Sequence, residues 1–322
     1  MGLLKTDSQL LKDFERELDP RWPERSGIPA RVLGYGEIST VFELQDAKGL
    51  ALKRMPIFES QKELDEYRAL YSRYNSLLIN DVGIPVPGYG SEHFTDDYGR
   101  IIFYIIQDKL PQDSIGSRLI HILPPEEVNR LFLLVLRELK KLVHFNRKNR
   151  GSLEIAVDGQ ISNWALEGFD PADPRPVDSY RVLYIDTSTP MIKINGDEQL
   201  DPELFLRSAP CFLVWIIRKL FLKDIMSRYY DIRLVTVDLI ANFFKEQLPG
   251  LIPGLINTAN QFFAGEGRGL VLSPITYREV KAYYREDALI WRLYLTFRKA
   301  DRLLHRFMGK RYVYILPEKV KR

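Results

Sequence analysis

Cysteine and histidine are scarce in this sequence, whose 322 residues include one cysteine and four histidines. The lone Cys211 excludes an intrachain disulfide, which favours a reducing, cytoplasmic location. The histidines lie far apart in the sequence, so no two of them have the close spacing of a transition-metal cage. They are His93, His121, His144 and His305.

Long apolar runs and an excess of one charge are also absent. The most apolar stretch, residues 212–222, contains Arg218 and Lys219 and falls short of the roughly 18 residues that cross a membrane. We therefore expect no membrane span. The 46 basic and 43 acidic residues leave a net charge of +3, too small an excess to indicate nucleic acid as a partner. The composition is that of a globular protein, and the length predicts two lobes.

A glycine-bearing segment, residues 33–42, has the pattern of two strands joined by a turn. Gly34 and Gly36 would let the backbone approach a phosphate-bearing ligand, because neither residue has a Cβ in the way. Ser39 stands where a third glycine often lies and keeps the turn slim. Taken alone, two such glycines are more typical of an ordinary hairpin turn.

The next strand is predicted for residues 50–55, with Lys53 on the face opposite its leucines and directed at the glycine turn. A flexible ammonium suits phosphate oxygens as a point charge. The following segment, residues 59–79, has apolar residues at helical spacing. It offers Glu66, or Glu63 one turn earlier, as the carboxylate that pairs with Lys53.

Three polar residues farther along have the spacing of a phosphoryl-transfer set: Asp158, Asn163 and Asp186. Such chemistry needs a carboxylate that orients or deprotonates a hydroxyl, and oxygen ligands that hold magnesium against phosphates. Each residue alone also suits a turn or a helix cap. The set becomes informative because the glycine turn and the lysine strand precede it in the same order.

This order resembles the protein-kinase-like fold, and within it the small-molecule branch of aminoglycoside phosphotransferases and choline kinases. The resemblance spans about residues 31–191, roughly half of the chain. It rests on Gly34-x-Gly36-x-x-Ser39-x-Val41, Ala51-Leu52-Lys53, Gly83-Ile84-Pro85-Val86-Pro87, Asp158 to Asn163, and Ile185-Asp186.

The resemblance implies an ATP- and Mg²⁺-dependent phosphotransferase that acts on a hydroxyl of a small molecule. Asp158 would be the catalytic base, and Asn163 and Asp186 would hold the magnesium ion. Lys53 would bind the α- and β-phosphates, with Glu66 as its partner. A hinge at residues 107–111 would present its backbone to the adenine edge. The residues that the resemblance assigns to nucleotide binding are Gly34, Gly36, Ser39, Lys53, Glu66, Gln107 and Lys109.

The sequence also departs from that family. Ala156 replaces the usual histidine two residues before the aspartate, and Gln160 stands where lysine or histidine is common. Thr187-Ser188 follows the second aspartate, and the Ala-Pro-Glu signature of protein kinases is missing. Besides an active enzyme, two hypotheses therefore stand: a catalytically degenerate kinase-like binding module, and an unrelated helical interaction protein whose motifs match by chance.

The expected fold is α+β and bilobal, with a small antiparallel-sheet lobe enclosing one helix and a larger, mainly helical lobe. Residues 1–30 would form a leading helix, capped near Asp7, and a connection. Residues 31–107 would form the nucleotide-binding lobe, and residues 108–322 the large helical catalytic lobe. The pattern leaves the acceptor and the oligomeric state open. Helices of the large lobe are predicted for residues 124–146, 202–228, 234–247, 252–263 and 277–308.

Overall fold

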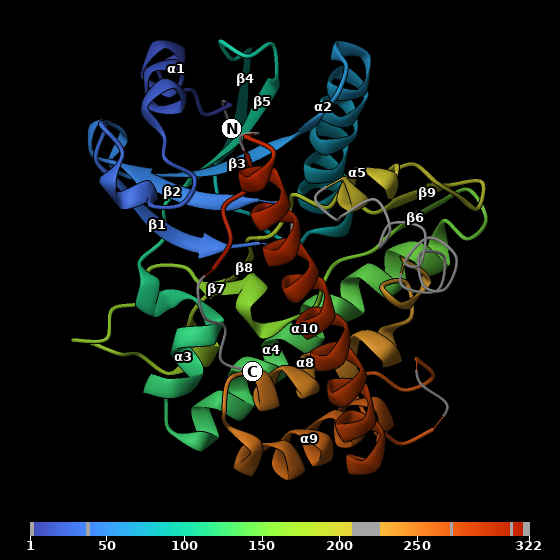
Figure 1. The fold of residues 1–322 in the computed structure, drawn as a ribbon. Helices are drawn as coiled ribbons and strands as arrows, with labels where there is room; N and C mark the ends of the chain where they lie inside the picture. Colours follow the sequence, from blue (N-terminus) through green and yellow to red (C-terminus); the bar gives the residue numbers. More distant parts are fainter. Residues whose placement is uncertain (1–2, 37–38, 208–225, 271–272, 310–311, 318–322) are drawn as a thin grey trace.

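The computed structural model describes residues 3–36, 39–207, 226–270, 273–309 and 312–317. Within these ranges the protein has the α+β class that the sequence predicts. A five-stranded antiparallel sheet lies at one end of the molecule, and most of the helices lie at the other (Figure 1). The strand order is β1-β2-β3-β5-β4. Their bounds are β1 (Ala30–Tyr35), β2 (Thr40–Leu44), β3 (Leu50–Phe58), β4 (Tyr89–Thr95) and β5 (Ile101–Asp108).

The two faces of this sheet bury different helices. Helix α1 (Ser8–Glu17) packs Leu11 and Phe14 against the face that includes Leu52. Its first turn is capped by Asp7, as predicted, with the carboxylate accepting from Gln9 N at 2.8 Å. Helix α2 (Gln61–Ser76) covers the opposite face, which includes Met55, Phe103 and Ile105. Alternation along β3 therefore places Leu52 and Lys53 on opposite faces, as expected.

A second group of helices carries the largest hydrophobic cluster. Helix α4 (Pro125–Lys148) shows why this part folds as it does, because its leucine, valine and phenylalanine residues recur every three or four positions and are buried together. The predicted helices at 124–146, 234–247, 252–263 and 277–308 are confirmed with small shifts of their ends. The elements are α3 (Gly116–Ile122), α4 (Pro125–Lys148), α8 (Ile232–Lys245), α9 (Ile252–Ala264) and α10 (Tyr277–Phe307).

The helix predicted for residues 202–228 is described only at its ends. Helix α5 covers Glu203–Leu206, and residues 208–225 lie outside the described residues, as does Cys211. Helix α10 is the longest described helix and runs across the molecule from the level of α9 to the level of β3 (Figure 1). No helix among the described residues combines the length and the apolar composition that crossing a membrane requires.

The described residues also form two small antiparallel sheets. One pairs β7 (Trp164–Leu166) with β8 (Val182–Tyr184), and residues 167–181 connect them. The other has the order β10-β9-β6. Its strands are β6 (Leu153–Ile155), β9 (Ile192–Ile194) and β10 (Asp197–Glu198).

Candidate functional site

Lys53 lies on the sheet face that carries α2, in register with the glycine-bearing hairpin. Gly34 pairs with Val41 of β2, and Val41 pairs with Lys53 of β3, so the glycine and the lysine lie two strands apart. The Lys53 Nζ atom donates to Asp186 Oδ1 at 2.7 Å and to Ser188 Oγ at 2.6 Å. The Lys53 side chain is 15% exposed, so solvent screens this ion pair only in part.

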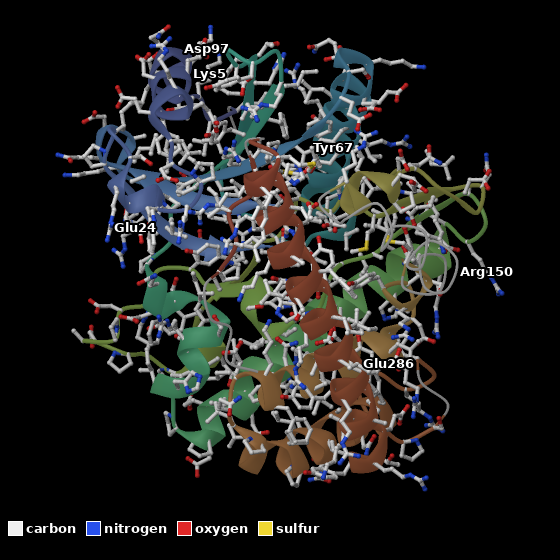
Figure 2. The ribbon with its side chains drawn as sticks, viewed as in Figure 1. Lys5, Glu24, Tyr67, Asp97, Arg150 and Glu286 are labelled. Carbon is white, nitrogen blue, oxygen red and sulfur yellow. The ribbon has the colours of Figure 1, made fainter. Side chains whose placement is uncertain are left out.

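The segment that contains Asp186 is fixed by hydroxyl and amide groups. Ser188 Oγ donates to Asp186 Oδ1 at 2.7 Å. The hydroxyl of Tyr67, a residue of α2 that is labelled in Figure 2, donates to the Ser188 carbonyl oxygen at 2.7 Å. Gln107 Nε2 donates to the carbonyl oxygen of Ile185 at 3.1 Å. Burial alone would raise the pKa of Asp186. The charge of Lys53 and the hydrogen bonds from Lys53 and Ser188 outweigh burial and hold that pKa below its ordinary value.

Asp158 lies in a loop whose flanking residues are fully buried. Val157 and Ile161 anchor the loop in the largest hydrophobic cluster. The Asp158 N–H donates to the hydroxyl of Tyr184 at 3.2 Å, while Oδ1 accepts from the N–H of Gln160 at 3.1 Å. The aspartate backbone is therefore held in place, and its side chain remains partly exposed.

Strand register brings Asn163 and Asp186 together. Trp164 of β7 pairs with Tyr184 of β8, so the residue before Trp164 lies beside the residue after Tyr184. Accordingly, the Ile185 N–H donates to the Asn163 carbonyl oxygen at 2.8 Å. The Asn163 Nδ2 group in turn donates to the Asp158 carbonyl oxygen at 3.2 Å. Hydrogen bonds, together with the peptide bond between Ile185 and Asp186, thus link Lys53, Asp186, Asn163 and Asp158 in one network.

Two oxygen atoms of this network have the chemistry of magnesium ligands. Among the described residues, neither Oδ2 of Asp186 nor Oδ1 of Asn163 has a hydrogen-bond partner. The Asp186 side chain is 33% exposed. Mg²⁺ typically takes one or two protein oxygens and completes its shell with phosphate and water, so the pair fits this ion. The described residues contain no group of three or more histidine, cysteine, aspartate and glutamate side chains suited to a metal.

The glutamate predicted to pair with Lys53 does not do so. The Glu66 side chain is 66% exposed and lies 3.8 Å from Lys62 Nζ. Glu63, the alternative, accepts from both terminal nitrogens of Arg207 at 2.7 and 2.8 Å. These hydrogen bonds lower the pKa of Glu63 to about 2. The physical reason is the rotation of α2, which turns Tyr67 toward Asp186 and Glu66 toward solvent.

Two residues of the predicted hinge, Gln107 and Asp108, belong to β5. The N–H groups of Asp108 and Lys109 donate to the carbonyl oxygens of Gly88 and Gly49 at 2.9 and 2.8 Å, so neither is available to an adenine edge. The ammonium of Lys109 contacts Glu43 of β2 and not the Lys53–Asp186 pair. Gln107 does reach the site, but through its side chain.

The glycine-bearing segment forms the β1–β2 hairpin, and its two glycines differ. A Cβ on Gly36 would lie 2.6 Å from Ser39 Oγ, and the Gly36 N–H donates to the Ser39 carbonyl oxygen at 2.9 Å. Gly36 and the buried Ser39 therefore close the turn. A Cβ on Gly34 would meet nothing within 4 Å among the described residues. Packing does not require a glycine at position 34, which leaves room there for an approaching ligand.

Helix α8 contributes two polar groups beneath the Asp158 loop that the sequence analysis did not identify. Lys245 Nζ donates to Gln160 Oε1 at 3.2 Å. Asp238 is 6% exposed. Burial raises the pKa of Asp238 well above its ordinary value, and the nearby charge of Asp158 adds to the effect. The available signal was their spacing of seven residues, which puts Asp238 and Lys245 on one side of a helix.

Gly159, next to Asp158, lies close against helix α8. A Cβ at this position would lie 2.4 Å from Val235 Cγ1 on α8. We expect Gly159→Ala to cost about 1–3 kcal/mol of stability, because the loop and α8 must separate. Urea unfolding of this variant would measure the loss.

The matched control is Gly34→Ala, which adds the same methyl group where the described residues leave space. It should change the free energy of unfolding by less than about 0.5 kcal/mol. The double variant Gly159→Ala/Val235→Ala should recover part of the loss. Equal stability of Gly159→Ala and the unaltered protein would contradict the close packing.

Comparison with known proteins places the chain in a family. A family model with the description "Family of unknown function (DUF6206)" matches residues 18–303, and the chain belongs to that family. No match is found among curated proteins. One of the matching solved structures is "WaaP in complex with acyl carrier protein". It has 13% sequence identity and a TM-score of 0.33, and the match covers 82% of this chain and 100% of that chain.

Proposed function

We propose that this member of the DUF6206 family is an ATP- and magnesium-dependent phosphotransferase that acts on a hydroxyl of a small molecule. In this proposal the chain has a kinase-like, bilobal fold of the aminoglycoside phosphotransferase and choline kinase type. Residues 31–107 form the nucleotide-binding lobe, residues 108–322 form the catalytic lobe, and residues 1–30 form the leading helix and connection. The enzyme works in the cytoplasm, without nucleic acid as a partner.

The observation that carries this proposal is the convergence of Lys53, Asp186, Asn163 and Asp158, which are linked by hydrogen bonds and by the Ile185–Asp186 peptide bond. These residues come from β3, from the end of β8 and from the loop before β7, and nothing in their local sequence requires them to meet. A chance resemblance of motifs does not predict such convergence. The set also has the composition that phosphoryl transfer needs: one ammonium, two carboxylates and one amide oxygen.

Each residue has a role that its surroundings support. Lys53 releases Asp186 and binds phosphate oxygens when the nucleotide enters, so the ammonium exchanges one anionic partner for another. Asp158 orients the acceptor hydroxyl and accepts its proton, from a backbone that Tyr184 holds. Gly34 lets the phosphates approach the hairpin, and Tyr67 and Ser188 keep Asp186 in place.

Asp186 Oδ2 and Asn163 Oδ1 would hold the magnesium ion. When bound, the ion neutralises charge on the phosphates. Asp186 is well suited to this role because the surroundings lower the pKa of its carboxyl group, which stays ionised well below neutral pH.

A second candidate function is a catalytically degenerate binding module of the same fold. One observation favours it: Lys53 and Asp186 satisfy each other, with Ser188 bridging them, and α2 provides no carboxylate to Lys53. A site arranged in this way binds nucleotide only if the ligand displaces an existing ion pair. Such a module would bind nucleotide weakly or without magnesium and would turn over none.

Adding ATP with magnesium should raise the melting temperature of the purified protein, and Lys53→Ala should remove most of the increase. Ligand at one hundred times its dissociation constant adds about 2.7 kcal/mol of stability, which differential scanning fluorimetry resolves readily. ATP without magnesium should give a smaller shift, because the phosphates then lack their counter-charge.

The matched control is Lys62→Ala, which removes an ammonium that is 84% exposed on α2. Its melting temperature should respond to ATP and magnesium as that of the unaltered protein does. A shift that needs no magnesium, with no turnover of ATP, would favour the degenerate module. A shift that survives Lys53→Ala unchanged would place the nucleotide elsewhere and contradict the proposed site.

A further inference from the structure

The outward face of α10 exposes more apolar surface than a solvated helix requires. Leu289 is 55% exposed, Leu293 47%, Leu303 54% and Phe307 89%. Thr296 and Ala300, between these residues, are also exposed. The inner face of α10 packs on α8, so this outward stripe is separate from the contacts that hold the helix in place. The stripe also lies outside the candidate site, so its role is independent of the proposed function.

The stripe has the spacing of a seam between helices. Its members alternate four and three residues apart over about 27 Å of helix. This is the repeat by which two helices keep their apolar rows in contact over several turns. Small residues in the middle of the row let another helix approach closely. This row, called the seam below, consists of Leu289, Leu293, Thr296, Ala300, Leu303 and Phe307.

A row of cations borders the seam on one side. Arg285, Arg292, Lys299 and Arg306 follow each other at intervals of seven residues, so they form a line parallel to the seam. The three arginines are exposed. The other border carries the apolar residues Ile290, Phe297 and Leu304. The surface is therefore asymmetric, with a line of positive charge along one edge of an apolar row.

We propose that this seam binds an α-helix of another protein, one that has an apolar stripe with acidic residues along the edge that meets the arginines. Both features of the seam select that partner. The four-three spacing matches a helix, and the line of cations matches carboxylates spaced one heptad apart on its flank.

A second copy of this chain fits less well. In an antiparallel pair the two lines of cations would face each other. In a parallel pair each line would face the border that carries Ile290, Phe297 and Leu304, and the carboxylate on that side, Glu286, already pairs with Arg228 at 3.0 Å. An anionic lipid surface also fits less well. It gains nothing from a seven-residue interval, and Glu286 at the start of the seam carries a negative charge (Figure 2).

The test uses a synthetic helical peptide of about four heptads, with leucine in the seam positions and glutamate on both flanks. A second peptide has lysine in place of every glutamate. Fluorescence anisotropy should show binding of the acidic peptide alone, weakened by added salt. The double variant Arg292→Glu/Arg306→Glu should weaken binding at least about tenfold, and Leu293→Glu/Leu303→Glu should abolish it. All four positions are exposed, so circular dichroism and the melting temperature should stay unchanged.

The control variant is Ile122→Glu, which places the same charge on an apolar side chain of α3 that is 46% exposed. It should bind the acidic peptide like the unaltered protein. Failure of the acidic peptide to bind, or equal binding of both peptides, would overturn the proposal. So would a dimer seen by light scattering, or sedimentation with phosphatidylglycerol vesicles, if the Leu293→Glu/Leu303→Glu variant loses it.

Discussion

Asp158→Asn is expected to lower magnesium-dependent turnover of ATP roughly a hundred- to ten-thousandfold, the range that general-base catalysis contributes. An amide still accepts the hydrogen bond from the Gln160 N–H, so the loop should keep its conformation. What the variant loses is the carboxylate that accepts the proton of the acceptor hydroxyl. Initial rates with a panel of hydroxyl-bearing acceptors, and with water, measure the effect.

Nucleotide affinity separates this role from a structural one. Asp158 makes no phosphate contact in the proposed site, so the dissociation constant for ATP should change by less than about a factor of three. The matched control is Asp178→Asn, whose side chain is 52% exposed. That variant should retain full turnover. Full turnover in Asp158→Asn would remove Asp158 as the base, and equal loss of turnover and affinity would make it a residue that shapes the site.

Arg54→Met is expected to cost about 3–5 kcal/mol, the largest stability loss that we predict for a single substitution. Arg54 lies beside Lys53 on β3 but on the opposite face, 4% exposed. It contacts both carboxylate oxygens of Glu15 on α1, and its third nitrogen donates to the Val313 carbonyl oxygen at 2.8 Å. The Tyr104 hydroxyl completes the cluster by donating to Glu15 at 2.6 Å.

The loss arises because removal of Arg54 leaves the carboxylate of Glu15 buried without a counter-charge. Burial alone would lower the pKa of Arg54, yet attraction and hydrogen bonding by Glu15 raise it above the ordinary value, so the guanidinium stays charged. The cluster also joins α1 and the C-terminal segment to the sheet. The melting temperature of Arg54→Met should fall by on the order of 10 °C in a chain of this size.

Two comparisons test that explanation. Arg137→Met breaks another bidentate arginine–glutamate pair, with Glu266, whose side chains are 40% and 47% exposed, and it should cost less than about 1 kcal/mol. The double variant Glu15→Leu/Arg54→Met should be more stable than Arg54→Met, because it leaves no buried unpaired carboxylate. Equal losses for Arg54→Met and Arg137→Met would show that burial does not govern the energy of the pair.

The sequence predicted the elements of this protein more closely than it predicted their contacts. The helix of residues 59–79 begins at Gln61, and the strand around Lys53 has its leucine and lysine on opposite faces. Such features depend on the alternation of apolar and polar side chains within about one or two turns. That pattern is present in any short window of the chain, so element type and the α+β class followed from it.

The convergence of the site could be expected only through a resemblance of motifs. Lys53 and Asp186 are 133 residues apart in the sequence, and no local pattern predicts the ion pair between them. The register of β7 and β8 decides that Asn163 lies beside Ile185, because pairing Trp164 with Tyr184 fixes every neighbour along the two strands.

By itself the sequence determined the helices within residues 59–79, 124–146, 234–247, 252–263 and 277–308 and the face of β3 that carries Lys53. Tertiary structure decided the partner of Lys53. Because of the rotation of α2, Glu63 pairs with Arg207, and the ammonium of Lys53 instead donates to Asp186 and Ser188. The tertiary structure also decided that Gly159 packs closely against Val235. The physical reason is the distance along the chain over which each effect acts. The periodicity of apolar residues depends on near neighbours in the sequence. The carboxylate that pairs with Lys53 depends instead on how elements far apart in the sequence pack together.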